Sequence, residues 1–166
     1  MINLETERLY ICEANICDIE QILKIENDED NKYYTWVSTY EEHVDDINNP
    51  NTTLLCVYTK DNNMIGYVIL DYHKNANSLE LRRVALIDKK KGYGTELFNE
   101  IFRYCFVDKN YNKIWLDVYH DNVRAIGLYE KLKMHKDGVL RENYIEERGY
   151  IDQIVYSLLK REYEGD

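Results

Sequence analysis

The sequence predicts a mixed α/β (α+β) domain with one central, mostly antiparallel sheet of about seven strands flanked by about four helices. Short segments alternate apolar and polar residues with the period of a strand, and longer segments repeat apolar residues with the period of a helix. These segments are interleaved along the chain. The 166 residues are 45% hydrophobic and include one proline, so we expect a single domain over residues 1–166.

The first part of the chain is expected to hold one strand and two helices. RLYICE at 8–13 alternates and predicts a strand. Asp18 precedes a helical repeat of apolar residues, which makes it a candidate N-cap. Ser38 and Glu41 lie three residues apart in STYE and predict a capping box at the start of a second helix.

Three consecutive strands are expected next. TLLCVYT at 53–59 and MIGYVILDY at 64–72 flank the turn-rich stretch KDNN, which predicts an antiparallel hairpin. The turn HKNANS separates this hairpin from LELRRVAL at 79–86, a third strand. A loop with two glycines follows this strand directly.

Two helices and three further strands complete the predicted order. An apolar stripe over residues 97–105 predicts the clearest helix of the chain. KIWLDVY at 113–119 alternates as a strand, and residues 125–132 repeat apolar side chains as a helix. Two late strands, near 139–144 and 150–158, surround the turn EERG.

Composition excludes several classes of function. The formal charge of −10 and the pI of about 4.9 argue against a nucleic-acid binder, which needs a basic face. The chain holds no apolar run long enough for a membrane span and no basic leader at its N-terminus. The four cysteines lack disulfide-framework spacing, so we expect reduced thiols and a cytoplasmic location. The four histidines are scattered, so we expect no metal site.

The stretch KKKGYGTEL at 89–97 has the properties of an anion-binding loop. The first N–H groups of a helix lack partners and carry its positive dipole end, so they favour a phosphate. Glycines allow close approach of a ligand, and the three lysines add positive charge. An ordinary helix-entry loop with solvated lysines remains an alternative. The loop lacks the Gly-Lys-Ser/Thr of a P-loop and the third glycine of a dinucleotide fingerprint.

Three motifs resemble the GNAT superfamily of N-acetyltransferases. Lys89-x-x-Gly92-x-Gly94 is similar to its Gln/Arg-x-x-Gly-x-Gly/Ala loop, and NVRAIGLYEK at 122–131 is similar to its N-x-x-A-x-x-x-Y-E-K helix. The tail at 138–159 resembles the closing hairpin of the ribosomal-protein, polyamine and aminoglycoside branches. Lys89 replaces the usual Gln or Arg, and Leu86 stands where many members have proline.

The resemblance implies a GNAT fold with a V-shaped splay between the fourth and fifth strands. It also implies acetyl-CoA as cosubstrate, held by backbone groups of the fourth strand, by the glycine loop and by the helix at 122–131. The expected cofactor-binding residues are Val84, Ala85, Leu86, Lys89, Lys90, Lys91, Gly92, Tyr93, Gly94, Thr95, Asn122 and Ala125.

The family reaction is direct attack of an amine on the thioester, and it suggests two catalytic residues. Tyr129 shares a helix face with Asn122 and Ala125 and is the candidate acid for the departing thiolate. A packing tyrosine is the alternative. Glu80 is the candidate base, displaced along its strand from the family's usual glutamate, with a solvated carboxylate paired with Arg82 as the alternative.

Residues 13–48 contain eleven acidic residues and two lysines, a balance of −9 out of the total −10. In the family this region walls the acceptor side, where Tyr34 and Trp36 are candidates to hold a cation. An ordinary solvated surface is the alternative. We therefore expect a primary amine of a small cationic molecule, or a protein N-terminus, as acceptor, with a homodimer as a further possibility. Two other functions stay open, namely a non-catalytic CoA sensor and an interaction protein.

Overall fold

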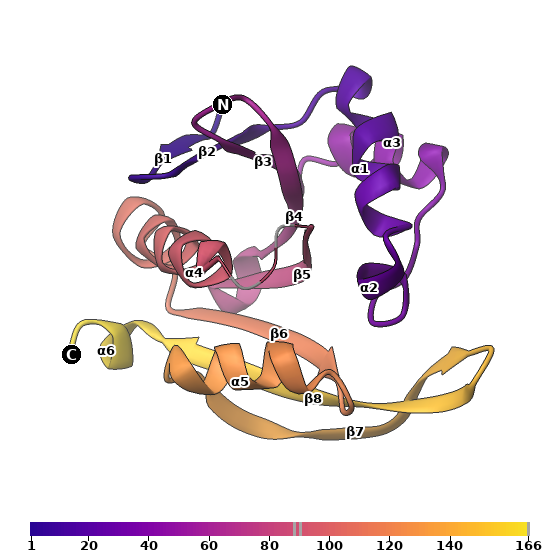
Figure 1. Cartoon of the computed structure of the whole chain (residues 1–166). Helices are drawn as coiled ribbons and strands as arrows, with labels where there is room; N and C mark the ends of the chain where they lie inside the picture. The colour runs from indigo at the N-terminus through magenta and orange to yellow at the C-terminus, as the bar shows by residue number, and fades with distance from the viewer. Residues whose placement is uncertain (88, 90, 166) are drawn as a thin grey trace.

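The structure is a computed structural model that describes residues 1–87, Lys89 and residues 91–165. Its described part contains one sheet in the order β1-β2-β3-β4-β5-β6-β8-β7 (Figure 1). The strands are β1 (Asn3–Glu5), β2 (Leu9–Glu13), β3 (Thr52–Thr59), β4 (Met64–His73), β5 (Ser78–Leu86), β6 (Lys113–Tyr119), β7 (His135–Glu146) and β8 (Gly149–Leu159). The α-helices are α1 (Ile19–Glu26), α2 (Glu29–Lys32), α3 (Tyr40–Asn48), α4 (Tyr93–Arg103), α5 (Val123–Lys131) and α6 (Lys160–Tyr163).

The predicted mixed, mostly antiparallel sheet is confirmed, with eight strands where about seven were expected. The additional strand, β1, is three residues long and too short to show a period of its own. Two short 3₁₀ turns (Ile16–Asp18 and Lys74–Ala76) and a π-helical turn (Tyr104–Asp108) complete the described elements.

β5 and β6 are the parallel pair of this sheet, and they diverge. Their pairing covers three residues of each strand, from Ser78 with Lys113 to Glu80 with Trp115. β5 continues to Leu86 along β4, and β6 continues to Tyr119 along β8. The register between β4 and β5 shifts where Ile69 pairs with Arg83 and Leu70 pairs with Leu81, so Arg82 is an extra residue in β5. This bulge bends β5 away from β6 and leaves a V-shaped opening between them (Figure 1).

Both faces of the larger half of the sheet are covered. α4 and its π-helical continuation pack on one face, in the principal core with Leu97, Phe98, Ile101 and Phe102. α1 covers the other face with Ile22 and Ile25, against Leu54, Tyr67 and Ile69. β3 serves both layers because its successive side chains point to opposite faces. α5 lies beside β6 and β8 on the other arm of the V (Figure 1).

The two N-terminal helix caps differ from those expected. α3 is capped by Thr39, whose hydroxyl accepts a hydrogen bond from the Glu42 N–H, with Glu42 closing the capping box. The predicted cap, Ser38, accepts a 2.6 Å hydrogen bond from Arg83 Nη1 at its hydroxyl instead. Asp18 closes a capping box around Asn15 at the preceding 3₁₀ turn and makes no side-chain cap of α1.

Candidate active site

A cavity of about 940 Å³ occupies the opening between β5 and β6. Its walls come from α2 and the loop after it, the β5 segment beyond the bulge, the start of α4, β6, α5 and the β7–β8 hairpin. The β5 residues 81–86 and the β6 residues 116–119 lie beyond the parallel pairing. Their inner edges therefore have backbone groups available for an extended ligand.

The glycine loop faces one end of this cavity. Gly92 is the N-cap of α4 and has a φ of +80°, a left-handed conformation that favours glycine. Among the described residues, none accepts a hydrogen bond from the N–H groups of Tyr93, Gly94 or Thr95. A Cβ on Gly94 would lie 3.2 Å from Leu128 Cδ2, so glycine here also lets α5 pack closely against α4.

A polar anchor behind the loop fixes its position. Arg8 Nη1 donates a 2.8 Å hydrogen bond to the Lys91 carbonyl, and its guanidinium pairs with Glu96 in the first turns of α4. Glu96 also accepts hydrogen bonds from the Thr6 hydroxyl and the Arg8 N–H. Burial opposes ionisation of Glu96, but these hydrogen bonds and the charge of Arg8 lower its pKa. The anchor holds the start of α4 in place without using the N–H groups of Tyr93, Gly94 and Thr95, which make no hydrogen bond to a described residue.

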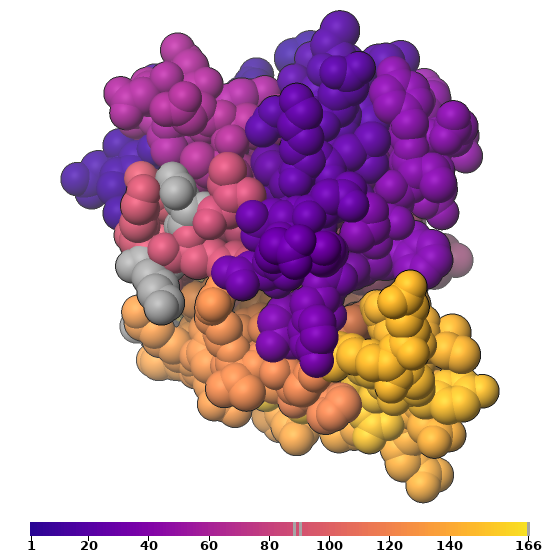
Figure 2. All heavy atoms as spheres, turned by 45° about the vertical axis from the view of Figure 1, so that its right-hand side comes forward, coloured from indigo at the N-terminus to yellow at the C-terminus, as the bar shows by residue number. Residues whose placement is uncertain are grey.

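Two cations and one carboxylate meet at the same end. Asp30 Oδ2 lies 3.8 Å from Lys89 Nζ and 3.8 Å from Arg124 Nη1. Burial lowers the pKa of Lys89, and the charge of Asp30 opposes this effect. Asp30 belongs to α2, Lys89 to the loop before α4, and Arg124 to α5. Figure 2 shows the purple segment that contains α2 lying against the orange and yellow segments of the other arm of the V.

Tyr129 lines the middle of the cavity from α5. Its ring lies 5.4 Å from the ring of Phe98 and 5.7 Å from that of Tyr156, measured between centroids. Burial raises the pKa of the Tyr129 phenol, and the charge of Asp117 adds to the effect. Asn122 caps α5 by accepting a hydrogen bond from the Ala125 N–H at 3.3 Å, and both residues line the cavity.

Asp117 of β6 also lines the cavity. Burial, with a smaller contribution from the charge of Glu80, raises the pKa of Asp117 to about 6. Gln153 Nε2 donates a 2.7 Å hydrogen bond to Asp117 Oδ1, and Asn143 Nδ2 donates a 2.7 Å hydrogen bond to Gln153 Oε1. This chain of amides fixes a carboxylate that titrates near neutrality, which is a property of catalytic bases.

The sequence and the fold agree with one family of proteins. The family model described as an acetyltransferase (GNAT) domain matches residues 8–135. The chain belongs to the GNAT acetyltransferase family.

Individual relatives of this GNAT chain differ in how much of it they match. The uncharacterized N-acetyltransferase p20 of Bacillus licheniformis is 36% identical over 75 residues, which cover 45% of this chain and 42% of p20. An N-alpha-acetyltransferase of Saccharolobus solfataricus is 28% identical over 148 residues, 80% of this chain and 84% of that protein. The chain thus spans less than half of p20 and most of the second relative.

A solved GNAT structure shows the same fold. The dodecameric spermidine N-acetyltransferase of Vibrio cholerae in an intermediate state has a TM-score of 0.81 and 22% identity, over 95% of this chain and 97% of that one. At this level of identity the likeness concerns the fold.

Most of the residues expected from the GNAT motifs lie around the cavity. Those that line it are Val84, Ala85, Leu86, Lys89, Gly92, Tyr93, Gly94, Thr95, Asn122, Ala125, Tyr129, Tyr34 and Trp36. Lys91 is not among the lining residues. Lys90 lies outside the residues that the structure describes.

The expectation for Glu80 needs correction. Glu80 pairs with Trp115 at the closed base of the V, and its Oε2 lies 2.8 Å from His73 Nε2. It does not line the cavity, which begins at Leu81 on this strand. Its alternative partner, Arg82, pairs with Asp46 and Asp71 instead. Asp117 was missed, although a carboxylate near the end of an alternating strand beside the GNAT splay was visible in KIWLDVY.

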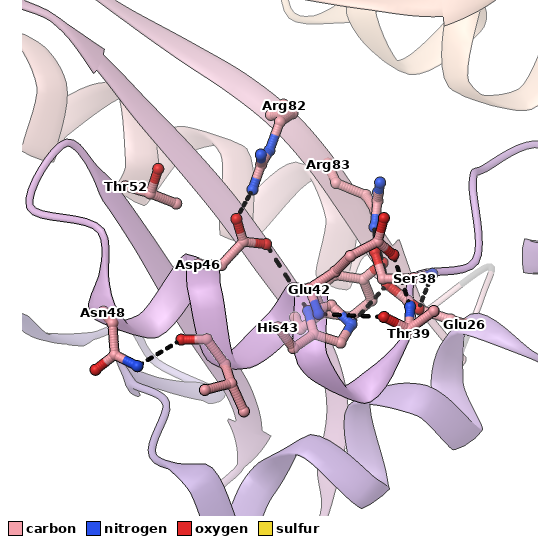
Figure 3. A network of polar contacts seen from close by, with 12 residues as sticks. Glu26, Ser38, Thr39, Glu42, His43, Asp46, Asn48, Thr52, Arg82 and Arg83 are labelled. Atoms are coloured by element: carbon pink, nitrogen blue, oxygen red, sulfur yellow. Dashed lines mark hydrogen bonds and ion pairs between the residues drawn. The ribbon is translucent and has the colours of Figure 1, made fainter.

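The acidic segment of this GNAT domain is also placed differently from the expectation. Of its carboxylates, Asp30 lines the cavity. Glu26 is fully buried and accepts hydrogen bonds from the Tyr67 hydroxyl at 2.6 Å, the Ser38 N–H at 2.9 Å and Arg83 Nη1 at 3.1 Å (Figure 3). Burial opposes its ionisation, but these partners and nearby His43 lower the pKa of Glu26. Two carboxylates of the segment, Glu26 and Asp46, thus pair with the arginines of β5, and one, Asp30, lines the cavity.

Two negative observations concern the part of the GNAT chain that the structure describes. Its His, Cys, Asp and Glu side chains form no group of three or more suited to a metal ion. None of its helices has the length and apolar character needed to traverse a bilayer.

Cys12, Cys17, Cys56 and Cys105 are free thiols.

Proposed function

We propose that this GNAT domain transfers the acetyl group of acetyl-CoA to a primary amine of a small cationic molecule or a protein N-terminus. The observation that supports this is the single cavity that connects the open N-terminal N–H groups of α4, the free edges of β5 and β6, the Tyr129 phenol and the Asp117 carboxylate. Such a cavity can hold a long anionic donor and an amine in one continuous space.

The donor end would use the chain's main-chain groups and two cations. The N–H groups of Tyr93, Gly94 and Thr95 would bind the diphosphate, with Lys89 and Arg124 contributing charge. The edge of β5 from Val84 to Leu86 would pair with the pantetheine arm as an added strand does. A backbone N–H on this edge would face the thioester oxygen and stabilise the developing oxyanion.

Tyr129 would serve as the acid. When the amine nitrogen bonds to the acetyl carbon, the carbon–sulfur bond breaks and the sulfur leaves as a thiolate. The Tyr129 hydroxyl would give it a proton, because the phenol stays protonated at neutral pH. The resulting phenolate would be reprotonated by the second proton that the former amine nitrogen loses as the amide forms. The proton demand is moderate, since an ordinary thiol has a pKa of about 8.5.

Asp117 would serve as the base in place of Glu80. An acceptor amine is an ammonium ion in neutral water and has no lone pair until it loses a proton. A carboxylate with a pKa of about 6 is largely ionised at pH 7 and remains basic enough to take that proton. The Gln153 amide hydrogen-bonds Asp117 and would hold it in place.

A screen for free thiol tests the enzymatic reading directly. Acetyl-CoA is incubated with spermidine, kanamycin, 2-phenylethylamine and a short peptide with a free N-terminus, and release of CoA thiol is followed. Release that depends on one of these amines supports the proposal. Binding of acetyl-CoA by calorimetry without release for any amine would favour a CoA sensor, and absence of binding would favour an interaction protein.

Two further parts of the proposal concern assembly and location. β7 ends the sheet and exposes Val139, Leu140 and Ile145, so we propose that a second copy pairs at this edge as a homodimer. The dodecameric spermidine N-acetyltransferase is a precedent for assembly within the fold. Free thiols are consistent with the cytoplasm as location.

A further inference from the structure

The charges that line the cavity are nearly balanced, although the chain as a whole is strongly acidic. Among the residues that the structure describes, three carboxylates line it (Asp30, Asp117 and Asp121), against four cations (Arg82, Arg83, Lys89 and Arg124). The total charge of −10 therefore says little about the ligand. The pairing of each group decides what kind of acceptor fits.

The two arginines of β5 are already neutralised from behind the cavity wall. Arg82 contacts Asp46 Oδ1 at 2.5 Å and Asp71 Oδ2 at 3.3 Å. Arg83 contacts the buried carboxylate of Glu26 at 3.1 Å, as Figure 3 shows. These carboxylates do not line the cavity. Their negative charge therefore neutralises the arginines and does not face a ligand.

Two of these three lining carboxylates already form ion pairs with cationic side chains. Asp30 lies between Lys89 and Arg124 at the donor end. Asp121 forms an ion pair with Arg148 at the turn of the β7–β8 hairpin. Arg148 Nη1 in addition donates a 2.9 Å hydrogen bond to the Tyr33 hydroxyl, which ties this turn to the segment after α2.

Asp117 is the remaining carboxylate among the described lining residues, and its described hydrogen-bond partner is an uncharged amide, Gln153. The acceptor part of the cavity therefore offers one uncompensated negative charge to an ammonium ion. Among the described lining residues, a second ammonium group on the same acceptor would find no further uncompensated carboxylate.

Aromatic side chains form that wall. The rings of Trp36 and Tyr144 lie 6.0 Å apart in an edge-to-face arrangement, and those of Tyr144 and Tyr119 lie 5.8 Å apart. Tyr34 lines the same space. Trp36 is 47% exposed and lines the cavity, so part of its ring surface is available to a bound ligand.

We propose that the acceptor is a monoamine: one primary ammonium group, bound by Asp117, on a flat apolar or aromatic body that packs against Trp36 and Tyr144. This inference rests on the proposed acetyl transfer and narrows its acceptor. It disfavours a polyamine as acceptor, because the further ammonium groups of a polyamine would find no other uncompensated carboxylate among the described lining residues.

The test compares acceptors that carry one, two or three ammonium groups. With the purified full chain and acetyl-CoA, kcat/KM is measured for 2-phenylethylamine, 1,4-diaminobutane and spermidine. We expect 2-phenylethylamine to exceed both polyamines by about tenfold or more, the discrimination typical of a pocket whose polar groups are matched by one substrate only. Equal or higher values for either polyamine would overturn the inference while leaving acetyl transfer in place.

Failure of the proposed function would give a different result. Calorimetry with acetyl-CoA alone reports donor binding, and thiol release with every acceptor reports chemistry. Absence of donor binding, or binding without release for all three amines, would overturn the acetyl-transfer proposal and the monoamine proposal together.

Variants locate the acceptor body. Trp36→Ala should lower kcat/KM for 2-phenylethylamine by about tenfold and leave that for ethylamine within about twofold, because ethylamine has no body to pack on the ring. Tyr150→Ala is the matched control, since Tyr150 is 67% exposed and does not line the cavity. An equal loss for both amines in Trp36→Ala would contradict the proposed contact.

Discussion

Gln153 Nε2 lies 2.7 Å from Asp117 Oδ1, so an amide of β8 holds a carboxylate of β6 that faces the cavity. The Asn143 amide in turn holds the oxygen of Gln153, which fixes which end of the Gln153 side chain points at Asp117. A donated hydrogen bond favours the ionised carboxylate, whereas burial and the charge of Glu80 favour the protonated one. The balance between these effects determines the pH at which Asp117 can accept a proton.

The pH dependence of activity should report this balance. We expect kcat/KM to fall below about pH 6 as Asp117 becomes protonated. Gln153→Leu removes the hydrogen bond to the charged form and should move this limb to higher pH. Glu80→Gln removes a nearby negative charge and should move it to lower pH. Opposite shifts of the two variants, in profiles recorded with one amine, are the expected result.

The variant Asp117→Asn tests directly whether Asp117 is the base. Without a base, kcat should fall by about 10²-fold or more, and the limb near pH 6 should disappear. The loss should be smaller with 2,2,2-trifluoroethylamine, whose weakly basic nitrogen is already unprotonated at pH 7. Glu80→Gln serves as the control for loss of a carboxylate, because it should shift this limb without removing it. An Asp117→Asn profile that keeps the wild-type limb would exclude Asp117 as the base.

The same substitution should stabilise the fold. The pKa of Asp117 is raised in the folded state, so the folded chain binds the proton more tightly than the unfolded chain between about pH 4 and pH 6. Wild-type stability therefore falls as pH rises through this range. Asp117→Asn removes that cost, which is at most about 3 kcal/mol at pH 8. Urea unfolding of the wild type and of Asp117→Asn at pH 4 and pH 8 measures this difference in the free energy of unfolding. An increase of equal size at both pH values would contradict the raised pKa of Asp117.

Tyr129→Phe separates the acid from the packing role of the ring. Phenylalanine keeps the contacts with Phe98 and Tyr156 and removes the hydroxyl. We expect kcat to fall by about 10²-fold or more, with unchanged affinity for acetyl-CoA in calorimetry. If kcat stays within about threefold, Tyr129 is a packing residue, as the alternative from the sequence holds.

Asp30 should compete with the donor phosphates for Lys89 and Arg124. Asp30→Asn releases both cations, so the Kd for acetyl-CoA should decrease by about threefold to tenfold at low salt, and less at high salt. Glu29→Gln is a suitable control because Glu29 pairs with Lys32 on the exposed side of the same helix and does not line the cavity. A higher Kd for acetyl-CoA in Asp30→Asn would show that Asp30 supports donor binding instead of competing with it.

The buried carboxylate of Glu26 should be a main determinant of stability. Glu26→Ala leaves Arg83 without its buried partner and should lower the free energy of unfolding by about 3 to 5 kcal/mol. Because the folded pKa of Glu26 is lowered, its contribution is present above pH 4.5 and is lost as the pH falls below that value. Asp45→Ala, on the exposed face of α3, should change stability by less than about 0.5 kcal/mol in the same urea titration.

Local sequence patterns predicted most of the fold. Alternation over 53–59, 64–72 and 113–119 and the apolar stripe over 97–105 each correspond to an observed element. The errors fall where tertiary contacts outweigh local signals. Ser38 matches a capping box by spacing, but its hydroxyl accepts a hydrogen bond from Arg83, which lies 45 residues away. α2 escaped prediction because four residues are too few for a period.

The candidate site was likewise predictable in part from the sequence. The glycine loop, Asn122 and Tyr129 lie in two contiguous motifs that resemble the GNAT family, and the resemblance is what placed them in one site; all of them line the cavity. The environment of Asp117 depends on Gln153, which comes from a strand 36 residues later, and no local pattern reports that contact. Likewise, a sum of charges over 13–48 cannot show that Glu26 faces inward to an arginine.

The short parallel pairing at the base of the V has a kinetic consequence. Ser78–Glu80 and Lys113–Trp115 join the two arms of the sheet, and beyond them the floor of the cavity has an open edge on each side. A donor lying along the β5 edge would complete that floor, and the amine would then rest on a surface that the donor helped to build. We therefore expect compulsory order, with acetyl-CoA entering first and CoA leaving last, which product inhibition by CoA should reveal as competition with acetyl-CoA alone.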